Sequence, residues 1–146
     1  MKTIAQQLNV KDFPFKIKDK KNNIIYLENS TGYWSKREFD SNKNLIYWEN
    51  SKGYWENREF DSNNNEIYFE DSDGYWVKRE YDANNNRIYV EIATGYWWKR
   101  EFDSNNNQIY YENSNGTIED TRPKSTPEYT IEELIAIEEF EFKIKK

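Results

Sequence analysis

The chain has no cysteine and no histidine among its 146 residues. Without cysteine it can form no disulfide and offers no thiol nucleophile. Without histidine it lacks the usual general base and the commonest zinc ligand. No apolar run follows Met1 and Lys2, so the sequence predicts neither a signal peptide nor a membrane span. We therefore expect a cytoplasmic protein that is not an enzyme and that holds no cofactor or metal.

Aliphatic residues are also scarce. Hydrophobic residues make up only 36 % of the chain, and aromatic residues alone account for 18 %. Tyrosine, tryptophan and phenylalanine suit pleated sheets and interfaces better than a deep aliphatic core. The net charge is −6. An acidic chain disfavours nucleic acid or an anionic membrane as a partner and allows a basic one.

The strongest pattern in the sequence is a repeat of 21 residues. The motif Gly-Tyr-Trp begins at Gly32, Gly53, Gly74 and Gly95, and an Arg-Glu-aromatic motif begins at Arg37, Arg58, Arg79 and Arg100. A strict period of this length indicates one supersecondary unit stacked on itself, in which each unit buries its apolar residues against a neighbour.

Each unit contains two short segments in which aromatic and β-branched residues alternate with polar ones. In the first unit these segments are 25–28 and 33–39, and the alternation predicts strands. Residues 29–32 end in a glycine and predict a turn, and the Asn-rich stretch 40–44 predicts the return turn. No repeat contains room for a crossover helix. We therefore predict a mainly β fold, an elongated antiparallel meander of tandem hairpins.

The loop lengths determine which side chains share a face of the predicted sheet. We expect Glu28 to lie opposite Tyr33, and Phe39 to lie opposite Leu45. In that register one face carries Ile25, Leu27, Trp34, Lys36 and Glu38, and the other carries Tyr26, Glu28, Tyr33, Arg37 and Phe39. Both faces mix aromatic and charged side chains, which predicts a thin sheet wetted on both sides. About eleven strands at ~4.8 Å would form an array roughly 50 Å long.

The two ends of the chain resemble each other. Residues 3–18 and 130–145 both begin with Thr-Ile and end with Phe-x-Phe-Lys-Ile-Lys. Each contains a capping box, which predicts a short helix that is followed by a strand. The capping boxes are Thr3 with Gln6 and Thr130 with Glu133, and the expected helices lie near 4–9 and 131–138. We interpret both segments as caps that blunt the edge strands of the array, with self-association as the alternative.

The sequence thus predicts a single repeat domain over residues 1–146. Its expected parts are an N-terminal cap at 1–19, hairpin repeats at 20–121, a linker at 122–129 and a C-terminal cap at 130–146. Two prolines in the linker exclude a further repeat strand there.

Three other chemistries fit parts of the repeat less well. Residues 61–65 place oxygens at alternate positions, as an EF-hand does, but the glycine and glutamate that such a calcium loop needs are absent. The Lys36-Arg37 pair and its repeats resemble a stripe for single-stranded nucleic acid, but a glutamate follows each arginine. Carboxylates such as Glu49 and Glu59 recur in every unit, whereas an active site is normally built once.

Departures from the repeat carry the functional prediction. In the fourth unit, large apolar residues are expected to lie close together: Val90, Ile92, Trp97 and Trp98. Tryptophan is a favoured hot spot of protein interfaces, so this cluster predicts a contact with a partner. Contact with the C-terminal cap, or self-association, is the alternative.

The third unit is the acidic one. Its candidate binding residues are Glu70, Asp71, Asp73 and Tyr75. Such a negative patch either meets a basic partner or is simply solvated. Together with the apolar cluster of the fourth unit, it predicts one patch for a single protein partner.

Several repeat families share parts of these motifs. The stretch 79–89 resembles the YD repeat, and the Gly-Tyr-Trp motif resembles MORN-like hairpin repeats. Choline-binding cell-wall repeats are similar in length and aromatic content. The small, acidic, Asn/Lys/Ile-rich chain is similar to phage or prophage inhibitors of bacterial defence nucleases, the anti-CRISPR kind. These resemblances imply a hairpin repeat protein and a non-enzymatic, protein-binding inhibitor. A glycan-binding module and a structural, self-assembling repeat are the alternatives.

Overall fold

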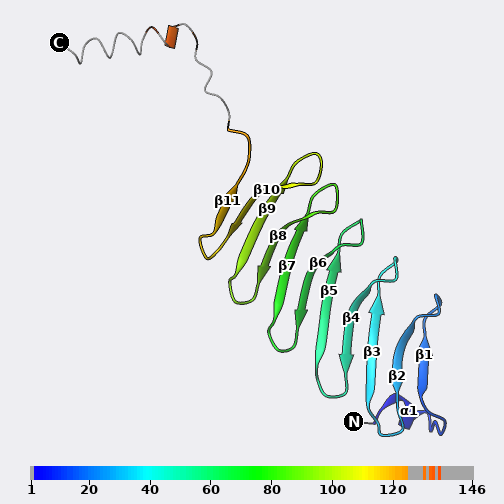
Figure 1. Cartoon of the computed structure of the whole chain (residues 1–146). Coiled ribbons are helices and arrows are strands. Elements are labelled where there is room, and N and C mark those ends of the chain that lie inside the picture. The colour runs from blue at the N-terminus through cyan, green and yellow to red at the C-terminus, as the bar shows by residue number, and fades with distance from the viewer. Residues whose placement is uncertain (1, 125–129, 131, 134, 136–146) are drawn as a thin grey trace.

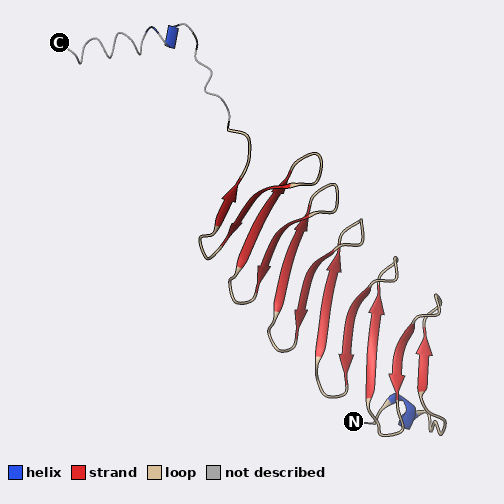
Figure 2. Ribbon diagram, viewed as in Figure 1, coloured by secondary structure: helices blue, strands red, loops and turns tan. Residues whose placement is uncertain are grey.

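The computed structural model describes residues 2–124 together with 130, 132, 133 and 135. Residues 2–124 form one short helix and a single antiparallel sheet, in which each strand pairs with the next along the chain (Figures 1 and 2). The elements are α1 (Ile4–Gln7), β1 (Phe15–Lys18), β2 (Ile24–Glu28), β3 (Trp34–Phe39), β4 (Leu45–Asn50), β5 (Trp55–Phe60), β6 (Glu66–Asp71), β7 (Trp76–Tyr81), β8 (Arg87–Ile92), β9 (Trp97–Phe102), β10 (Gln108–Asn113) and β11 (Ile118–Asp120). The predicted hairpin meander is confirmed, and the sheet is open along its whole length.

The glycine turns join the first strand of each unit to the second. At the β4–β5 turn, the Asn50 amide donates to the Tyr54 carbonyl and the Gly53 amide donates to the Asn50 carbonyl. Gly53 has a φ of 85°, a left-handed conformation that side chains with a Cβ rarely adopt. The Asn50 side chain completes the turn by accepting from the Lys52 amide at 2.8 Å. The repeated glycine is therefore a conformational requirement of the hairpin.

The return turns begin with an aspartate that caps them. Asp61 Oδ1 accepts from the amides of Asn63 and Asn65, both at 2.9 Å, and Asp61 Oδ2 accepts from the Asn65 side chain. The same arrangement recurs at Asp19, Asp40, Asp82 and Asp103. These carboxylate oxygens face N–H donors, so the Asp-Asn loops are built as Asx turns, and no cluster of three acidic side chains suited to a metal lies among the described residues.

A ladder of asparagines links successive return turns. Asn64, Asn85 and Asn106 adopt left-handed φ values of 65°, 64° and 62°. The side-chain oxygen of each accepts from an asparagine of the preceding unit, as Asn85 does from Asn65 at 2.9 Å. Asparagine tolerates this conformation better than most residues and also supplies the amide that joins the units. The Asn-rich loops therefore link successive repeats at the end of the strands where the return turns lie.

The predicted register is wrong at the glycine turn and correct at the return turn. Glu28 lies opposite Trp34, not opposite Tyr33, because the turn includes Tyr33 as its last residue. Phe39 lies opposite Leu45 as expected. A bulge between Glu38 and Phe39 shifts the pairing by one residue at that point. Strand side chains therefore divide between the two faces differently from the prediction.

The observed register gives two distinct faces. The first, which we call the Tyr–Glu face, carries the Tyr-x-Glu pairs of the first strands: Tyr26 and Glu28, Tyr47 and Glu49, Tyr68 and Glu70, Tyr89 and Glu91, Tyr110 and Glu112. The second, the Arg face, carries Arg37, Arg58, Arg79 and Arg100. Cross-strand partners share a face and sequence neighbours point to opposite faces.

Helix α1 covers the Tyr–Glu face of the first unit. The Thr3 hydroxyl, the Ala5 amide (3.1 Å) and the Tyr26 hydroxyl (2.7 Å) all donate to the Glu28 carboxylate, which is 1 % exposed. Burial raises the pKa of Glu28, but the three hydrogen bonds together outweigh burial and hold this pKa below its ordinary value. The predicted capping box of Thr3 and Gln6 is present. The N-terminal cap is thus anchored on a buried carboxylate.

The C-terminal cap is described only in part. The Thr130 amide donates to the Glu133 carboxylate at 2.7 Å, and the Glu133 amide donates to the Thr130 hydroxyl at 3.2 Å. The predicted second capping box is therefore confirmed, and residues 132, 133 and 135 are helical. The strand expected in this cap lies outside the described residues.

Candidate binding surface

The Tyr–Glu face has nearly the same chemistry in every unit. The Tyr68 hydroxyl donates to Glu70 at 3.0 Å, and Tyr47 and Tyr110 make the equivalent bond. The following strand places a tryptophan opposite the glutamate in four units and Ile118 in the fifth. A lysine lies over that tryptophan in the first, third and fourth units, 5.1–5.3 Å from the ring centroid. Residues that recur in this way support the sheet rather than one particular contact.

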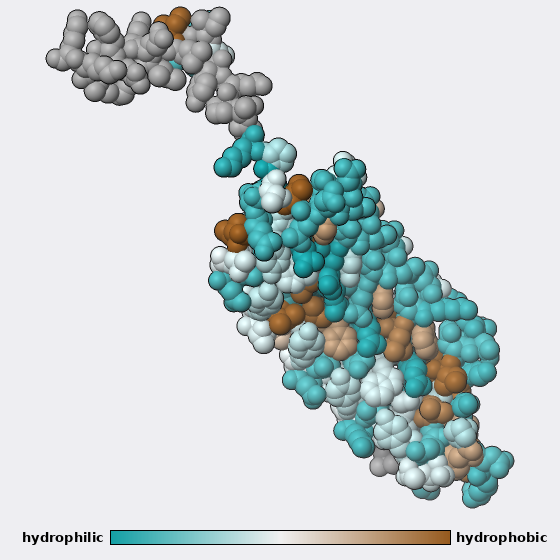
Figure 3. Space-filling model, viewed as in Figure 1, coloured by the Kyte–Doolittle hydropathy of each residue, from teal (hydrophilic) through white to brown (hydrophobic). Residues whose placement is uncertain are grey.

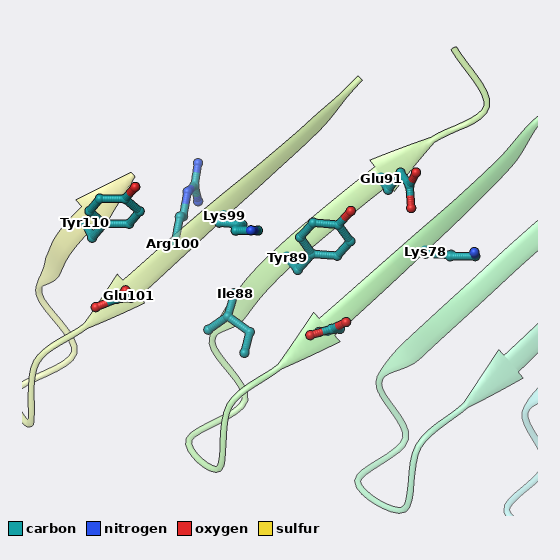
Figure 4. A pocket seen from close by; sticks show the side chains of 9 residues that line it. Lys78, Ile88, Tyr89, Glu91, Lys99, Arg100, Glu101 and Tyr110 are labelled. Carbon is teal, nitrogen blue, oxygen red and sulfur yellow. The ribbon is translucent and has the colours of Figure 1, made fainter. Parts of the chain in front are cut away.

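Shallow depressions recur along this face at equivalent positions. One of them, with a volume of about 570 Å³, is lined by Tyr89, Glu91, Lys99 and Glu101 among others (Figure 4). In Figure 4 the Tyr89, Lys78 and Lys99 side chains border the same hollow. Arg100 also lines it, but its side chain leaves β9 in another direction from that of Lys99. Smaller depressions have the equivalent residues around Tyr68 and Tyr26. In the first unit, Ile4 of α1 also lines this hollow.

The Arg face combines a constant row with a variable one. In the constant row each arginine lies opposite an aromatic residue or a valine: Arg37 opposite Trp48, Arg58 opposite Phe69, Arg79 opposite Val90 and Arg100 opposite Tyr111. Arg58 stacks on Phe69 with 5.2 Å between its Cζ and the ring centroid. Glu66 joins two units of this row, because it forms ion pairs with both Arg58 and Arg79.

The variable row changes its chemistry at every step along the sheet. Its cross-strand pairs are Ser35 with Asn50, Glu56 with Asp71, Val77 with Ile92, and Trp98 with Asn113. The row thus goes from polar to acidic to apolar to aromatic across four neighbouring hairpins. Scaffold residues recur in a repeat protein, so a row that never repeats is the candidate contact surface.

The two carboxylates at the acidic step of the variable row already have partners within the chain. Glu56 and Asp71 face each other across β5 and β6, a like-charge pair that would be unfavourable alone. Arg58 forms an ion pair with Glu56, and the Tyr54 hydroxyl lies 3.3 Å from both carboxylates. Burial and the two carboxylates raise the pKa of Tyr54 to about 12. The tyrosine therefore stays protonated and bridges the pair.

The apolar step gives up a turn bond that other units make. Asn50, Asp71 and Asn113 each accept from the amide two residues ahead. Ile92 holds the same position in the fourth unit and has no acceptor in its side chain. It pairs instead with Val77, which is 3 % exposed. A break of a local rule at one unit is typical of a functional position.

The aromatic step lies beside two arginines. Trp98 has the Cζ of Arg100 at 4.3 Å and the Cζ of Arg87 at 5.2 Å from its ring centroid. Arg100 also lies 5.7 Å from the ring of Tyr111. Its Nε is buried and has no hydrogen-bond partner among the described residues. This cationic, aromatic cluster has no counterpart in the third unit, where Glu66 and Val77 stand at the equivalent positions.

The structure brings together three of the four apolar residues predicted from the sequence. Val90 lies opposite Trp98, and both share the Arg face with Ile92. Trp97 points to the Tyr–Glu face, where it lies opposite Glu91 and beneath Lys99. The space-filling view shows apolar residues in separate spots among polar ones rather than as one broad patch (Figure 3).

The acidic residues predicted in the third unit are distributed over both faces and a turn. Glu70 is on the Tyr–Glu face and accepts from Tyr68 and Asn57. Asp71 caps the β6–β7 turn by accepting from the amides of Asp73 and Tyr75. Asp73 is exposed, and Tyr75 is 44 % exposed. Sequence reasoning missed Val77, Arg87 and Arg100, although the replacement of Glu66 by Arg87 at the same repeat position was a visible signal.

Comparisons with known proteins agree with the architecture. No family model and no curated protein matches the chain. A solved structure of the Photorhabdus luminescens Tc holotoxin pore, with a mutation in TccC3, is similar with a TM-score of 0.52 and 10 % identity over 70 % of this chain. TcdB2-TccC3-Cdc42 (TM-score 0.50, 11 % identity, 68 % of this chain) and TcdB2-TccC3-TEV (0.50, 10 %, 78 %) are similar too. The chain is a tandem β-hairpin repeat protein.

The similarity covers a small part of the matched structures. The repeat array corresponds to 7 %, 5 % and 6 % of those chains. At this identity the likeness concerns the fold alone, and it confirms the predicted resemblance to hairpin repeats at that level. In the part of the chain that the structure describes, no helix is long and apolar enough to cross a membrane.

Proposed function

We propose that this chain is a non-enzymatic repeat module that binds one protein partner through the Arg face of its third and fourth units. The observation that supports this is the contrast between the two faces. The Tyr–Glu face repeats its chemistry, whereas the variable row of the Arg face changes at each hairpin. The solved structures that it resembles are a holotoxin pore and multi-component complexes, which is in keeping with binding or assembly.

The contact surface is centred on Val77, Ile92, Val90 and Trp98. Ile92 and Trp98 are partly exposed over two buried valines, so a partner would cover an apolar spot that is already rigidly packed. A few well-packed aromatic and apolar anchors carry most of the binding energy of an interface. The more specific expectation of an inhibitor of a bacterial defence nuclease rests on composition and remains a prediction.

Capture of a partner by matched variants tests the proposal. The tagged full chain and an Ile92→Asn/Trp98→Ser variant are compared in lysate of the cells that produce the protein, with mass spectrometry as the readout. Asn50 and Ser35 hold these positions in other units, so the fold should tolerate both changes. We expect capture to fall at least about tenfold, the effect of losing one hot spot.

A second variant serves as the matched control. The Lys78→Asn/Lys99→Asn variant alters the Tyr–Glu face. Asn57 already holds the equivalent position in the second unit, so the fold should tolerate the change. Capture should be unchanged by this variant. Equal capture by the wild type and the Ile92→Asn/Trp98→Ser variant would reject the proposed surface.

Glycan binding is the second candidate, because equivalent depressions recur along the Tyr–Glu face. Periodic aromatic and carboxylate groups suit a polymer with a regular repeat. Pull-down with insoluble cell-wall glycan tests it: retention that is lost in a Tyr68→Ala/Tyr89→Ala variant would favour the glycan. No retention of the wild-type chain on the glycan, together with loss of protein capture from lysate in the Ile92→Asn/Trp98→Ser variant, would favour the protein partner.

A further inference from the structure

We propose that Arg87, Trp98 and Arg100 form a binding site for a carboxylate of an acidic peptide segment. This inference deepens the proposed function and rests on it, because Trp98 belongs to the same surface. It assigns a ligand chemistry to the cationic part of the Arg face, which lies beside the apolar pair Val77 and Ile92.

The geometry of the cluster leaves two cations beside one ring. The Cζ atoms of Arg87 and Arg100 lie 5.2 Å and 4.3 Å from the Trp98 ring centroid. Two positive charges beside one ring favour the binding of an anion at this cluster. Arg87 is exposed, so the site is open to solvent. The cation–π contacts with Trp98 place both guanidinium groups beside the ring, and their N–H groups can donate to an oxyanion.

The neighbouring unit shows what such a site accepts. There Glu66 forms ion pairs with both Arg58 and Arg79, with 3.3 Å between its carboxylate and Arg58 Nε. Arg87 replaces Glu66 one repeat later, so the bridging carboxylate is exchanged for a second cation. Among the described residues neither Arg87 nor Arg100 forms an ion pair, and the buried Arg100 Nε has no acceptor. A buried donor without a partner is costly. An external carboxylate at Arg87 and Arg100 would supply the negative charge that Glu66 supplies in the preceding unit.

The charge of the chain favours a peptide over a nucleic acid. A net charge of −6 repels a polyanion over its whole length, whereas a single acidic segment needs only this local cationic pair. The acidic segment has two sources, namely a partner protein or residues 128–141 of this chain, which contain six glutamates. Both supply the same carboxylate chemistry.

Nuclear magnetic resonance of the full chain gives a residue-specific test. Hexaglutamate peptide is titrated into the uniformly ¹⁵N-labelled protein, and the Arg side-chain Nε–H and Trp indole signals are followed. The proposal predicts saturable shifts of the Arg100 Nε–H and Trp98 indole signals. Shifts that spread equally over lysine-rich parts of the sheet, or the absence of any shift at Arg100, would overturn it.

Two variants separate the site from general charge. Arg87→Glu recreates the arrangement seen at Glu66, so the fold should persist, and the internal carboxylate should lower peptide affinity at least about tenfold. Lys99→Gln removes one positive charge from the opposite face of the same strand and should leave affinity unchanged. Equal losses in both variants, or a single-stranded RNA oligonucleotide that displaces the peptide from Arg100, would reject the proposal.

A third variant distinguishes the two sources. Glutamine replaces every glutamate of 128–141 in the full chain. If the chain's own segment occupies the site, the Arg100 Nε–H signal shifts before peptide is added and the peptide binds more tightly. If the source is a partner, neither changes, and the peptide still binds. If no peptide binds at Arg100 while partner capture is still lost in the Ile92→Asn/Trp98→Ser variant, the proposed function stands and only this site is rejected.

Discussion

Ile92 on β8 lies directly opposite Val77 on β7, at the step of the sheet where the two preceding hairpins place polar pairs. Val77 is 3 % exposed, although the sheet has no second layer over its Arg face in the described residues. Neighbouring long side chains on the same face therefore bury it. The pair shows how a single-layer sheet can form a local apolar centre where its repeat is broken.

The Ile92→Asn variant should change the free energy of unfolding by less than about 1 kcal/mol. The new side chain would cap the turn as Asn50 does, which is worth about 1 kcal/mol and offsets the lost apolar contact with Val77. Val77→Asn should cost about 2 kcal/mol or more, because it places an amide at a buried site. Denaturant unfolding of both variants checks the contrast, and equal losses would contradict it.

Glu28 should be the carboxylate on which the N-terminal cap depends most. Glu28→Ala removes the acceptor for Thr3, Ala5 and Tyr26, and should cost about 2–3 kcal/mol. Hydrogen exchange should accelerate at the α1 amides. Glu70→Ala is the matched control on the same face, without a helix above it, and should cost less than about 1 kcal/mol. Similar protection of α1 in wild type and Glu28→Ala would disprove the anchor.

Stability should fall as the solution becomes acidic. Hydrogen bonds from the turn asparagines, with backbone amides, hold the pKa of the capping aspartates below the ordinary value, as at Asp61 and Asp82. A lowered folded-state pKa adds stability above the unfolded pKa of about 4, and this stability is lost as pH falls through the folded pKa. Melting curves between neutral pH and pH about 3 measure the loss. Asp61→Asn/Asp82→Asn should flatten the dependence, and an unchanged slope would refute this cause.

Alkaline conditions should destabilise the sheet through two tyrosines. Burial, with a neighbouring carboxylate, raises the pKa of Tyr26 and of Tyr54 to about 12. A raised folded-state pKa adds stability below the unfolded value of about 10, and that stability is lost as pH rises from about 10 to about 12. Tyrosinate absorbance during a pH titration measures this. Tyr54→Phe should remove part of the late-titrating absorbance. If all tyrosines ionise near pH 10, the prediction fails.

The stability of the protein should depend on the residue at position 85 in the asparagine ladder. Asn85→Gly keeps the left-handed φ but loses the bond from Asn65, and should cost about 0.5–1 kcal/mol. Asn85→Ala loses the bond and adds backbone strain, and should cost about 1–2 kcal/mol. Thermal unfolding gives the order Asn, Gly, Ala. A variant with alanine as stable as the glycine one would exclude the conformational argument.

The architecture could be predicted from the sequence because every repeat contains the residues that determine its two turns. Glycine and Asp-Asn positions recur at constant spacing, and their backbone preferences leave few alternatives to a hairpin. The assignment of side chains to the two faces of the sheet was harder to predict, because the turn at Tyr33 and the bulge at Phe39 each shift the strand register by one residue. Arg87 and Val77 were not predicted as site residues. Arg87 is placed there by its contact with Trp98, and Val77 by its pairing with Ile92, from which the register expected from the sequence separates it.

The central claim, that the partner covers the Arg face, is tested most directly by carbene footprinting of the full chain alone and with the captured partner. Labelling at Ile92 and Trp98 should fall on binding, while labelling at Tyr89 and Lys99 on the opposite face should stay the same. Protection of Tyr89 and Lys99, with Ile92 and Trp98 still labelled, would contradict the account.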